Sequence, residues 1–194
     1  MSEYPDILSH TGRKTVPSVR SRALAPILAP VRGGLLNGVL FLCPVGAGAV
    51  EPVTGTAKVV DGDTVVIGSV EIDLHGIDAP ELGQTCHSRK KKPFDCGALS
   101  RQALIGVIGS RKLTCKPVTA DKTGRMVADC ILGWLNINEQ MVIDGRAFAQ
   151  PTADNPYLRA QKFAEARKDG LWRGTFDWPW DWRKANPKPG AETQ

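Results

Sequence analysis

The sequence predicts an α+β domain in which three helices accompany a small antiparallel β-barrel. β-branched and apolar residues alternate over residues 55–74, and two further strand-like runs cover residues 112–118 and 125–132. Three other segments space their apolar residues as helices do. Two pairs of strands separated by one helix and followed by two more helices indicate one mixed domain.

The strands are expected to form two hairpins. Residues 55–74 are rich in Val, Ile and Thr, with a tight turn available at Gly68-Ser69. Residues 76–92 hold turn-forming and charged residues and should form a loop. The second hairpin joins residues 112–118 to residues 125–132 through "TADKTG", whose Asp, Lys and Gly favour a turn.

The helices have recognisable ends. Residues 96–108 carry apolar residues at helical spacing, and Gly109 is a plausible stop. The segment "NINEQMVIDGRA" begins with Asn136, which can cap a helix, and has Gly145 at its end. The third helix, within "PYLRAQKFAEARKDGLW", should end at Gly170. Its predicted inward face consists of Leu158, Phe163 and Ala166.

Residues 1–49 are interpreted as a leader. A basic stretch precedes an apolar core at residues 35–45 and the small residues Ala47-Gly48-Ala49, as in a secretory signal. An uncleaved membrane anchor is the alternative. The leader holds five of the 25 basic and two of the 20 acidic residues, so the rest of the chain carries a net charge of only +2. That charge does not by itself argue for nucleic-acid binding. We expect a secreted or periplasmic protein.

Four cysteines follow the leader, and they indicate two disulfides in an oxidising compartment. Three pairings are possible. We favour Cys86 with Cys96, which closes a basic loop, and Cys115 with Cys130, which cross-links consecutive strands. The absence of closely spaced Cys-x-x-Cys pairs argues against structural zinc.

The stretch "VVDGDTVVIGSVEIDLHGIDAPE" contains two acidic clusters that flank a run of apolar and β-branched residues. Asp61 and Asp63 open one strand, while Asp78 and Glu81 follow the next. Strand ends meet in a barrel, and like charges 4 Å apart repel by about 4 kcal/mol at an effective dielectric near 20. A shared cation would relieve this repulsion, and oxygen ligands select a hard ion such as calcium or magnesium. The alternative is that both clusters are ordinary turns.

The motifs "VVDGDTVVI", "GIDAPE" and "DKTGR", in this order and at these distances, resemble the staphylococcal nuclease-like (thermonuclease) family. The resemblance extends from about residue 56 to residue 172. It implies a five-stranded OB-fold antiparallel β-barrel with three helices, and calcium-dependent hydrolysis of DNA or RNA. On this basis residues 50–182 form the nuclease domain, and residues 183–194 form a polar tail expected to be disordered.

The resemblance also implies roles for individual residues. Glu81 would activate the attacking water, and Arg125 would stabilise the pentavalent phosphate. The implied Ca²⁺ ligands are Asp63, Asp78 and the Ala79 backbone carbonyl, with Asp61 supporting the metal shell.

One position departs from the family. A second phosphate-binding arginine is usual five residues before the metal aspartate, and here that position is Asp73. Three outcomes stay open: Asp73 faces away, a basic residue of "HSRKKK" substitutes, or the enzyme is slow. His75, on the same face of the strand, is either a phosphate ligand or a half-buried polar residue. The candidate substrate contacts of the basic loop are Arg89, Lys90, Lys91 and Lys92, and a solvated charge run is their alternative.

Two functions are therefore carried forward. The first is an exported, monomeric, calcium-dependent endonuclease, for which the effect of Asp73 on the rate stays open. The second is a non-catalytic OB-fold module that binds nucleic acid or a cell-envelope partner. The retention of Asp63, Asp78, Glu81 and Arg125 together favours catalysis. The tryptophans at residues 172–182 are expected to pack against the barrel.

Overall fold

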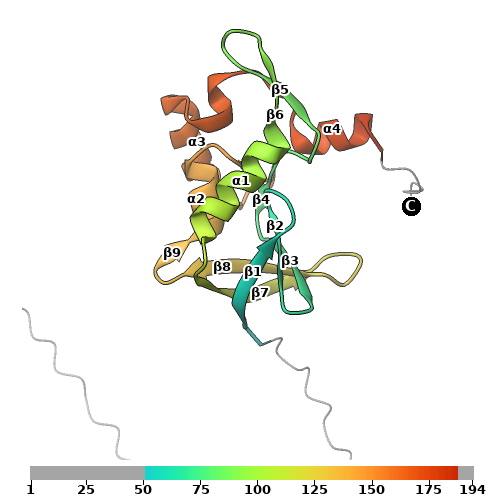
Figure 1. Ribbon diagram of the computed structural model, residues 1–194, viewed down its shortest axis with the longest axis vertical. Helices are drawn as coiled ribbons and strands as arrows, with labels where there is room; N and C mark the ends of the chain where they lie inside the picture. Colours follow the sequence, from blue (N-terminus) through green and yellow to red (C-terminus); the bar gives the residue numbers. More distant parts are fainter. Residues whose placement is uncertain (1–50, 188–194) are drawn as a thin grey trace, which may run out of the picture. The chain divides into compact units, whose positions relative to one another are not determined.

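The computed structural model describes residues 51–187, and a closed β-barrel forms the lower part of this domain in the view of Figure 1, with the helices above it. The strands follow one another in the order β3-β2-β1-β7-β8, and β3 pairs with β8 to close the barrel. This is the predicted OB-like α+β fold. The barrel strands are β1 (Val53–Val59), β2 (Thr64–Ile67), β3 (Val70–Leu74), β7 (Lys112–Ala120) and β8 (Met126–Leu132).

The closing pair differs from the prediction of a wholly antiparallel barrel. β3 and β8 run parallel, with Ile72 opposite Met126 and Asp73 opposite Val127, while the other barrel pairs are antiparallel. A parallel pair needs a long crossover, and the chain between these strands supplies it. The pairing places the start of β8 beside Asp73.

The helices agree in part with the sequence. α1 ends at Gly109, whose φ is 58°, and α2 is capped by the Asn136 side chain, which accepts from the amide of Glu139. The inward face predicted for α3 is wrong, because Ala160 and Ala164 are buried and Phe163 is half exposed. The helices are α1 (Cys96–Ile108), α2 (Ile137–Ile143), α3 (Leu158–Arg167), a 3₁₀ turn (Gly170–Arg173) and α4 (Pro179–Ala185).

α4 is a fourth helix that the sequence reasoning missed. It runs across residue 183, the expected start of the polar tail, so residues 183–185 are helical. Short strands complete the fold. These are β4 (Ile77–Asp78) with β10 (Phe148–Ala149), β5 (Thr85–His87) with β6 (Pro93–Asp95), and β9 (Leu135–Asn136) beside β8.

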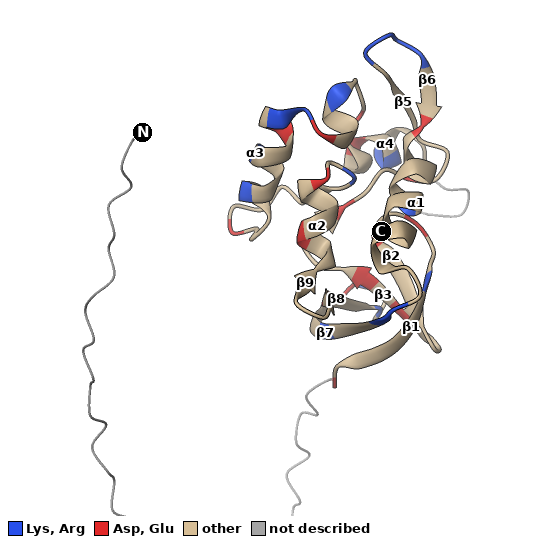
Figure 2. Ribbon diagram, turned by 60° about the vertical axis from the view of Figure 1, so that its left-hand side comes forward, with Lys and Arg blue, Asp and Glu red and all other residues tan. Residues whose placement is uncertain are grey.

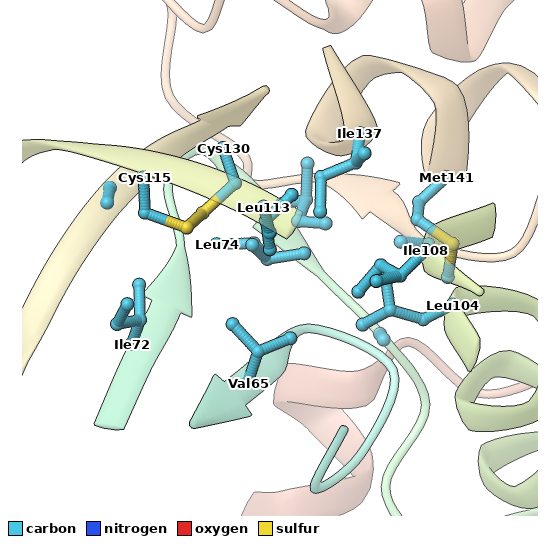
Figure 3. Close-up of a cluster of buried hydrophobic side chains, with 14 of the residues drawn as sticks. Val65, Ile72, Leu74, Leu104, Ile108, Leu113, Cys115, Cys130, Ile137 and Met141 are labelled. Carbon is cyan, nitrogen blue, oxygen red and sulfur yellow. A yellow bond between two sulfur atoms is a disulfide. The ribbon is translucent and has the colours of Figure 1, made fainter. Parts of the chain in front are cut away.

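The main core fills the barrel and continues under α1 and α2, as Figure 3 shows for Leu74, Leu104 and Met141. Both favoured disulfide pairings are confirmed: Cys86 bonds Cys96, and Cys115 bonds Cys130. The second bond lies inside the barrel core and joins directly opposed residues of β7 and β8.

A smaller aromatic core lies beside the first, and it confirms that the tryptophans pack on the domain. Phe148 of β10 is fully buried and contacts rings of the C-terminal segment. Trp178 and Trp180 stack with their ring centroids 4.8 Å apart. The members are Phe148, Trp172, Phe176, Trp178 and Trp180, with Phe94, Leu171 and the Cys86–Cys96 disulfide around them.

The predicted leader and the last seven residues lie outside the described part of the chain. Within residues 51–187, the helices are all too short or too polar to cross a bilayer. The choice between a secretory signal and a membrane anchor therefore stays a prediction.

Candidate active site

The turn between β1 and β2 carries the first pair of acids. The Asp63 amide donates to Asp61 Oδ1 at 3.2 Å, and the Val60 amide donates to the Thr64 carbonyl at 3.0 Å. Gly62 allows this turn to pack closely against Ala79, since a Cβ at position 62 would lie 2.5 Å from the Ala79 side chain. The turn is thus packed directly against the loop that follows β4.

That second loop carries Asp78 and Glu81. β4 pairs with β10, which fixes Asp78 opposite Phe148, and the Ala79 amide donates to Asp63 Oδ2 at 2.7 Å. The Glu81 amide donates to Oε1 of the fully buried Gln84 at 3.1 Å. Hydrogen bonds therefore join the two acidic loops and set the backbone on which Glu81 stands.

The acids from both loops converge on one pocket of about 360 Å³. Strands of the barrel bring them together although they are up to 20 residues apart in sequence, and two guanidinium groups face them. The pocket is lined by Asp61, Asp63, Thr64, Asp73, Ile77, Asp78, Glu81, Arg125, Gln150 and Arg183.

Burial and neighbouring charges disfavour the ionised forms of two carboxyl groups in the pocket. Burial raises the pKa of Asp63 well above its usual value, and the charges of Asp61 and Asp78 raise it further. Burial also raises the pKa of Asp78, while hydrogen bonds from Arg183 oppose that rise. Because ionised carboxylates here repel one another, a positive partner stabilises the charged site.

Arg125, which follows Gly124 at the end of the β7–β8 turn, is held by three carboxylates. Its guanidinium lies 3.0 Å from Glu71, 2.9 Å from Asp73 and 2.9 Å from Asp121. Hydrogen bonds from Arg125, chiefly to Asp121, hold the guanidinium pKa above its usual value. Asp73 therefore does not face away: it lies in the pocket and binds the predicted catalytic arginine.

Arg183 of α4 is a charged pocket residue that sequence reasoning missed, and Thr64, Ile77 and Gln150 are uncharged ones. The Arg183 guanidinium donates to both carboxylate oxygens of Asp78, at 2.8 and 2.7 Å, and to Glu81 Oε1 at 2.9 Å. The sequence carried one usable signal, because Pro179 in "DWPWDWRKA" favours the first turn of a helix. Nothing in the sequence indicated that this helix would reach the acids.

His75 and the basic loop lie outside the acidic pocket. His75 Nδ1 contacts Asp129 Oδ1 at 3.0 Å, and the Tyr157 hydroxyl donates to the same oxygen at 3.1 Å. His75 lines an adjoining pocket together with Asp73 and Arg125. The basic turn between β5 and β6 projects from one end of the described domain (Figure 2), and none of its four basic residues lines the acidic pocket.

The pocket offers carboxylate oxygens, the donor type that hard cations prefer, but its acids do not form a metal-ligand cluster in the described residues. Within residues 51–187, no group of three or more His, Cys, Asp or Glu is arranged to hold a metal ion. Asp63 and Asp78 nevertheless repel each other, and a guanidinium already bridges Asp78 and Glu81. Carboxylate oxygens such as those of Asp63, Asp78 and Glu81 are ligands that calcium and magnesium prefer and that softer metals do not.

Comparison with known proteins identifies the family. Residues 71–174 match the model of the staphylococcal nuclease homologue family. The chain belongs to this family. The matched segment contains Asp78, Glu81 and Arg125, while Asp61, Asp63 and Arg183 lie outside it.

Proteins with sequences similar to this chain include named nucleases and one protein with a name of another kind. The chain is 35% identical over 131 residues to the succinoglycan biosynthesis protein ExoI of Rhizobium meliloti strain 1021, covering 66% of this chain and 68% of that protein. It is 36% identical over 125 residues to the probable staphylococcal-like nuclease CAN3 of Oryza sativa subsp. japonica, covering 63% of this chain and 30% of that protein. It is 29% identical over 148 residues to the micrococcal nuclease of Shigella flexneri, covering 66% and 79% respectively. The chain thus spans less than a third of the rice protein.

Proposed function

We propose that this staphylococcal nuclease homologue is an exported, calcium-dependent endonuclease that hydrolyses phosphodiester bonds of DNA or RNA. The observation that carries the proposal is the meeting of Asp63, Asp78, Glu81 and Arg125 in one pocket. An anionic diester needs its charge neutralised as a fifth oxygen arrives, and this pocket combines acids for a cation with guanidinium groups for phosphate. The two disulfides support the proposal of export.

The chemistry of each pocket residue suggests its role in the reaction. Asp63, Asp78 and the Ala79 carbonyl would hold Ca²⁺, with Asp61 supporting them, and the ion would add positive charge next to the phosphate. Glu81 stands on a loop fixed by Gln84, and we assign it to orient the attacking water and take its proton. Arg125 is assigned to the developing charge on the phosphate.

Asp73 makes this a slow enzyme in our proposal. It shares the Arg125 guanidinium with Glu71 and Asp121, so the arginine has to give up carboxylate contacts to reach a phosphate. Removing one transition-state donor commonly costs about 10²- to 10³-fold in rate. Partial sequestration of Arg125 should cost less than that.

The proposal is tested by digestion of single-stranded DNA and of RNA with and without Ca²⁺. Glu81→Gln keeps the shape of the side chain and should lower kcat by about 10²- to 10⁴-fold through loss of the general base. Glu139→Gln, on the exposed surface of α2, is the matched control and should leave kcat unchanged. Calcium-independent cleavage, or full activity in Glu81→Gln, would contradict the proposed mechanism.

A second candidate is a non-catalytic module that binds nucleic acid or a cell-envelope partner. This candidate is supported by two ion pairs that occupy the arginines of the pocket, Arg125 with Asp73 and Arg183 with Asp78. One relative is named a succinoglycan biosynthesis protein and not a nuclease, which also favours a role other than cleavage of nucleic acid. A native chain that binds DNA tightly but turns over none with Ca²⁺ would favour this candidate. We expect a monomer in either case, which sedimentation would test.

A further inference from the structure

Arg183 reaches the acidic pocket from outside the segment that matches the family. The family match ends at residue 174, and α4 begins at Pro179. One buried side chain joins the two regions, because Gln84 Nε2 donates to the Asp177 carbonyl at 2.7 Å while Gln84 Oε1 accepts from the Glu81 amide at 3.1 Å. The chain entering α4 is therefore tied to the same loop that carries Glu81.

The aromatic core fixes how α4 is presented. Trp178, which precedes the helix, packs edge-on against Phe148 with the ring centroids 5.0 Å apart, and Phe148 lies opposite Asp78 in the β4–β10 pair. Pro179 is buried, and Arg183, four residues later, lies on the same helix face. The next residue, Lys184, has 76% of its side chain exposed. The helix thus aims Arg183, and not Lys184, at the pocket.

Arg183 and a cation compete for the same oxygens. The guanidinium uses both carboxylate oxygens of Asp78, which has only 6% of its side chain exposed. A carboxylate has about four lone-pair sites, of which the guanidinium uses two, so a cation on the remaining sites of Asp78 would lie next to the positive guanidinium and repel it. Because α4 stays anchored by its aromatic residues, the released side chain remains beside the pocket, where it is 44% exposed and has room to turn.

A released guanidinium in this pocket has one natural new partner. Its planar fork matches two phosphate oxygens, and it keeps its charge at all relevant pH values. The other guanidinium, Arg125, is shared among three carboxylates, one of which is the pocket residue Asp73. An anionic transition state in this pocket therefore needs a second positively charged side chain, one that is not shared with Asp73.

We propose that Arg183 is a phosphate-binding residue of the reaction: Asp78 and Glu81 hold its guanidinium in the structure, and the guanidinium would move to the substrate phosphate if a cation were bound at Asp78. This inference rests on the nuclease function proposed above. Arg183 would supply the positive charge that is missing at position 73, where the family usually has an arginine and this chain has Asp73. The C-terminal helix α4 would then be part of the active site.

Three variants test the proposal: Arg183→Ala, Arg183→Lys, and Lys184→Ala as the matched control one residue away. Calorimetry with Ca²⁺ alone should show about tenfold tighter binding to Arg183→Ala, since modest ion pairs no longer have to be broken. Binding of thymidine bisphosphate in the presence of Ca²⁺ should weaken by about 10- to 100-fold, as expected for the loss of a charged hydrogen-bond donor.

Turnover provides the third measurement. Arg183→Ala should lower kcat on single-stranded DNA by about 10²- to 10³-fold, and Arg183→Lys should recover part of it. Lys184→Ala should match the native chain in all three measurements. A purely structural role for Arg183 would not tighten Ca²⁺ binding while it weakens binding of the bisphosphate.

The possible failures are distinguishable. If the native chain cleaves DNA and Arg183→Ala cleaves it equally well with unchanged bisphosphate affinity, the inference about Arg183 is wrong and the nuclease function stands. If Arg183→Ala cleaves faster than the native chain, Arg183 only blocks the cation and does not bind phosphate. If the native chain cleaves neither DNA nor RNA, the proposed function fails, and the bisphosphate measurement still decides whether Arg183 binds phosphate.

Discussion

Gly97, in the first turn of α1, is a position where one methyl group should disturb the active site. A Cβ placed there would lie 1.9 Å from the carbonyl oxygen of Glu81, 2.4 Å from its carbonyl carbon and 2.7 Å from the amide nitrogen of Leu82. All three are backbone atoms, so no side-chain rotation relieves the clash. In Gly97→Ala the loop or the helix has to move.

The size of the movement follows from the distance. Ordinary van der Waals contact begins at about 3.4 Å, so the shortest approach has to open by about 1.5 Å. Displacing a catalytic group by about 1 Å commonly costs about 10²-fold in rate, and we expect kcat/KM on single-stranded DNA to fall by at least that factor. Overpacking should also lower the free energy of unfolding by about 1 to 3 kcal/mol.

Gly106 in the same helix is the matched control, because a Cβ there has no heavy atom within 4 Å apart from its chain neighbours and the nearby backbone of its own helix. Gly106→Ala should raise the free energy of unfolding by about 0.5 to 1 kcal/mol, since alanine is the better helix former, and should leave the rate unchanged. Urea unfolding followed by tryptophan fluorescence, with initial rates on the folded variants, measures both quantities. Native rate and native stability in Gly97→Ala would refute the packing argument.

Two further predictions concern Asp73, which lines the acidic pocket, and Tyr157, which is buried in the main core. Asp73→Asn removes one of the three carboxylates that hold Arg125 and should raise kcat/KM by about three- to fivefold, which corresponds to the free energy of one partly exposed ion pair. Initial rates at saturating Ca²⁺ measure this change. A fall in activity in the folded variant would show that Asp73 positions Arg125 and does not sequester it. Burial raises the pKa of Tyr157 to about 12, so the difference in absorbance titration between the native chain and Tyr157→Phe should show ionisation near that pH. Because this pKa is raised above the unfolded value near 10, the stabilising contribution is complete below about pH 10 and is lost as the pH rises towards 12; a difference titration centred at pH 10 would contradict it.

Local signals in the sequence predicted much of the fold. Gly109 and Asn136 mark helix ends through backbone and capping chemistry that depends on a few neighbouring residues. The disulfide between Cys115 and Cys130 follows from two consecutive strands lying side by side. These features need no knowledge of the rest of the molecule.

The features that sequence reasoning missed depend on distant contacts. The parallel pairing of β3 with β8 joins Ile72 to Met126, and no local pattern sets the direction of such a pair. The position of α4 depends on Trp178 packing against Phe148, which comes from another part of the chain. Phe163 fits a helical apolar face by spacing, yet α3 buries Ala160 and Ala164 and leaves the phenyl ring half exposed, a choice of face that spacing alone does not decide.

The pairing of β3 with β8 also determines when a growing polypeptide acquires its site. The acids at residues 61–81 are made early, but the strand that completes the barrel ends only at Leu132, and Arg183 follows later still. Contacts between positions this far apart form slowly, because the intervening chain must first be ordered. A partly synthesised chain therefore carries the carboxylates without the scaffold that gathers them.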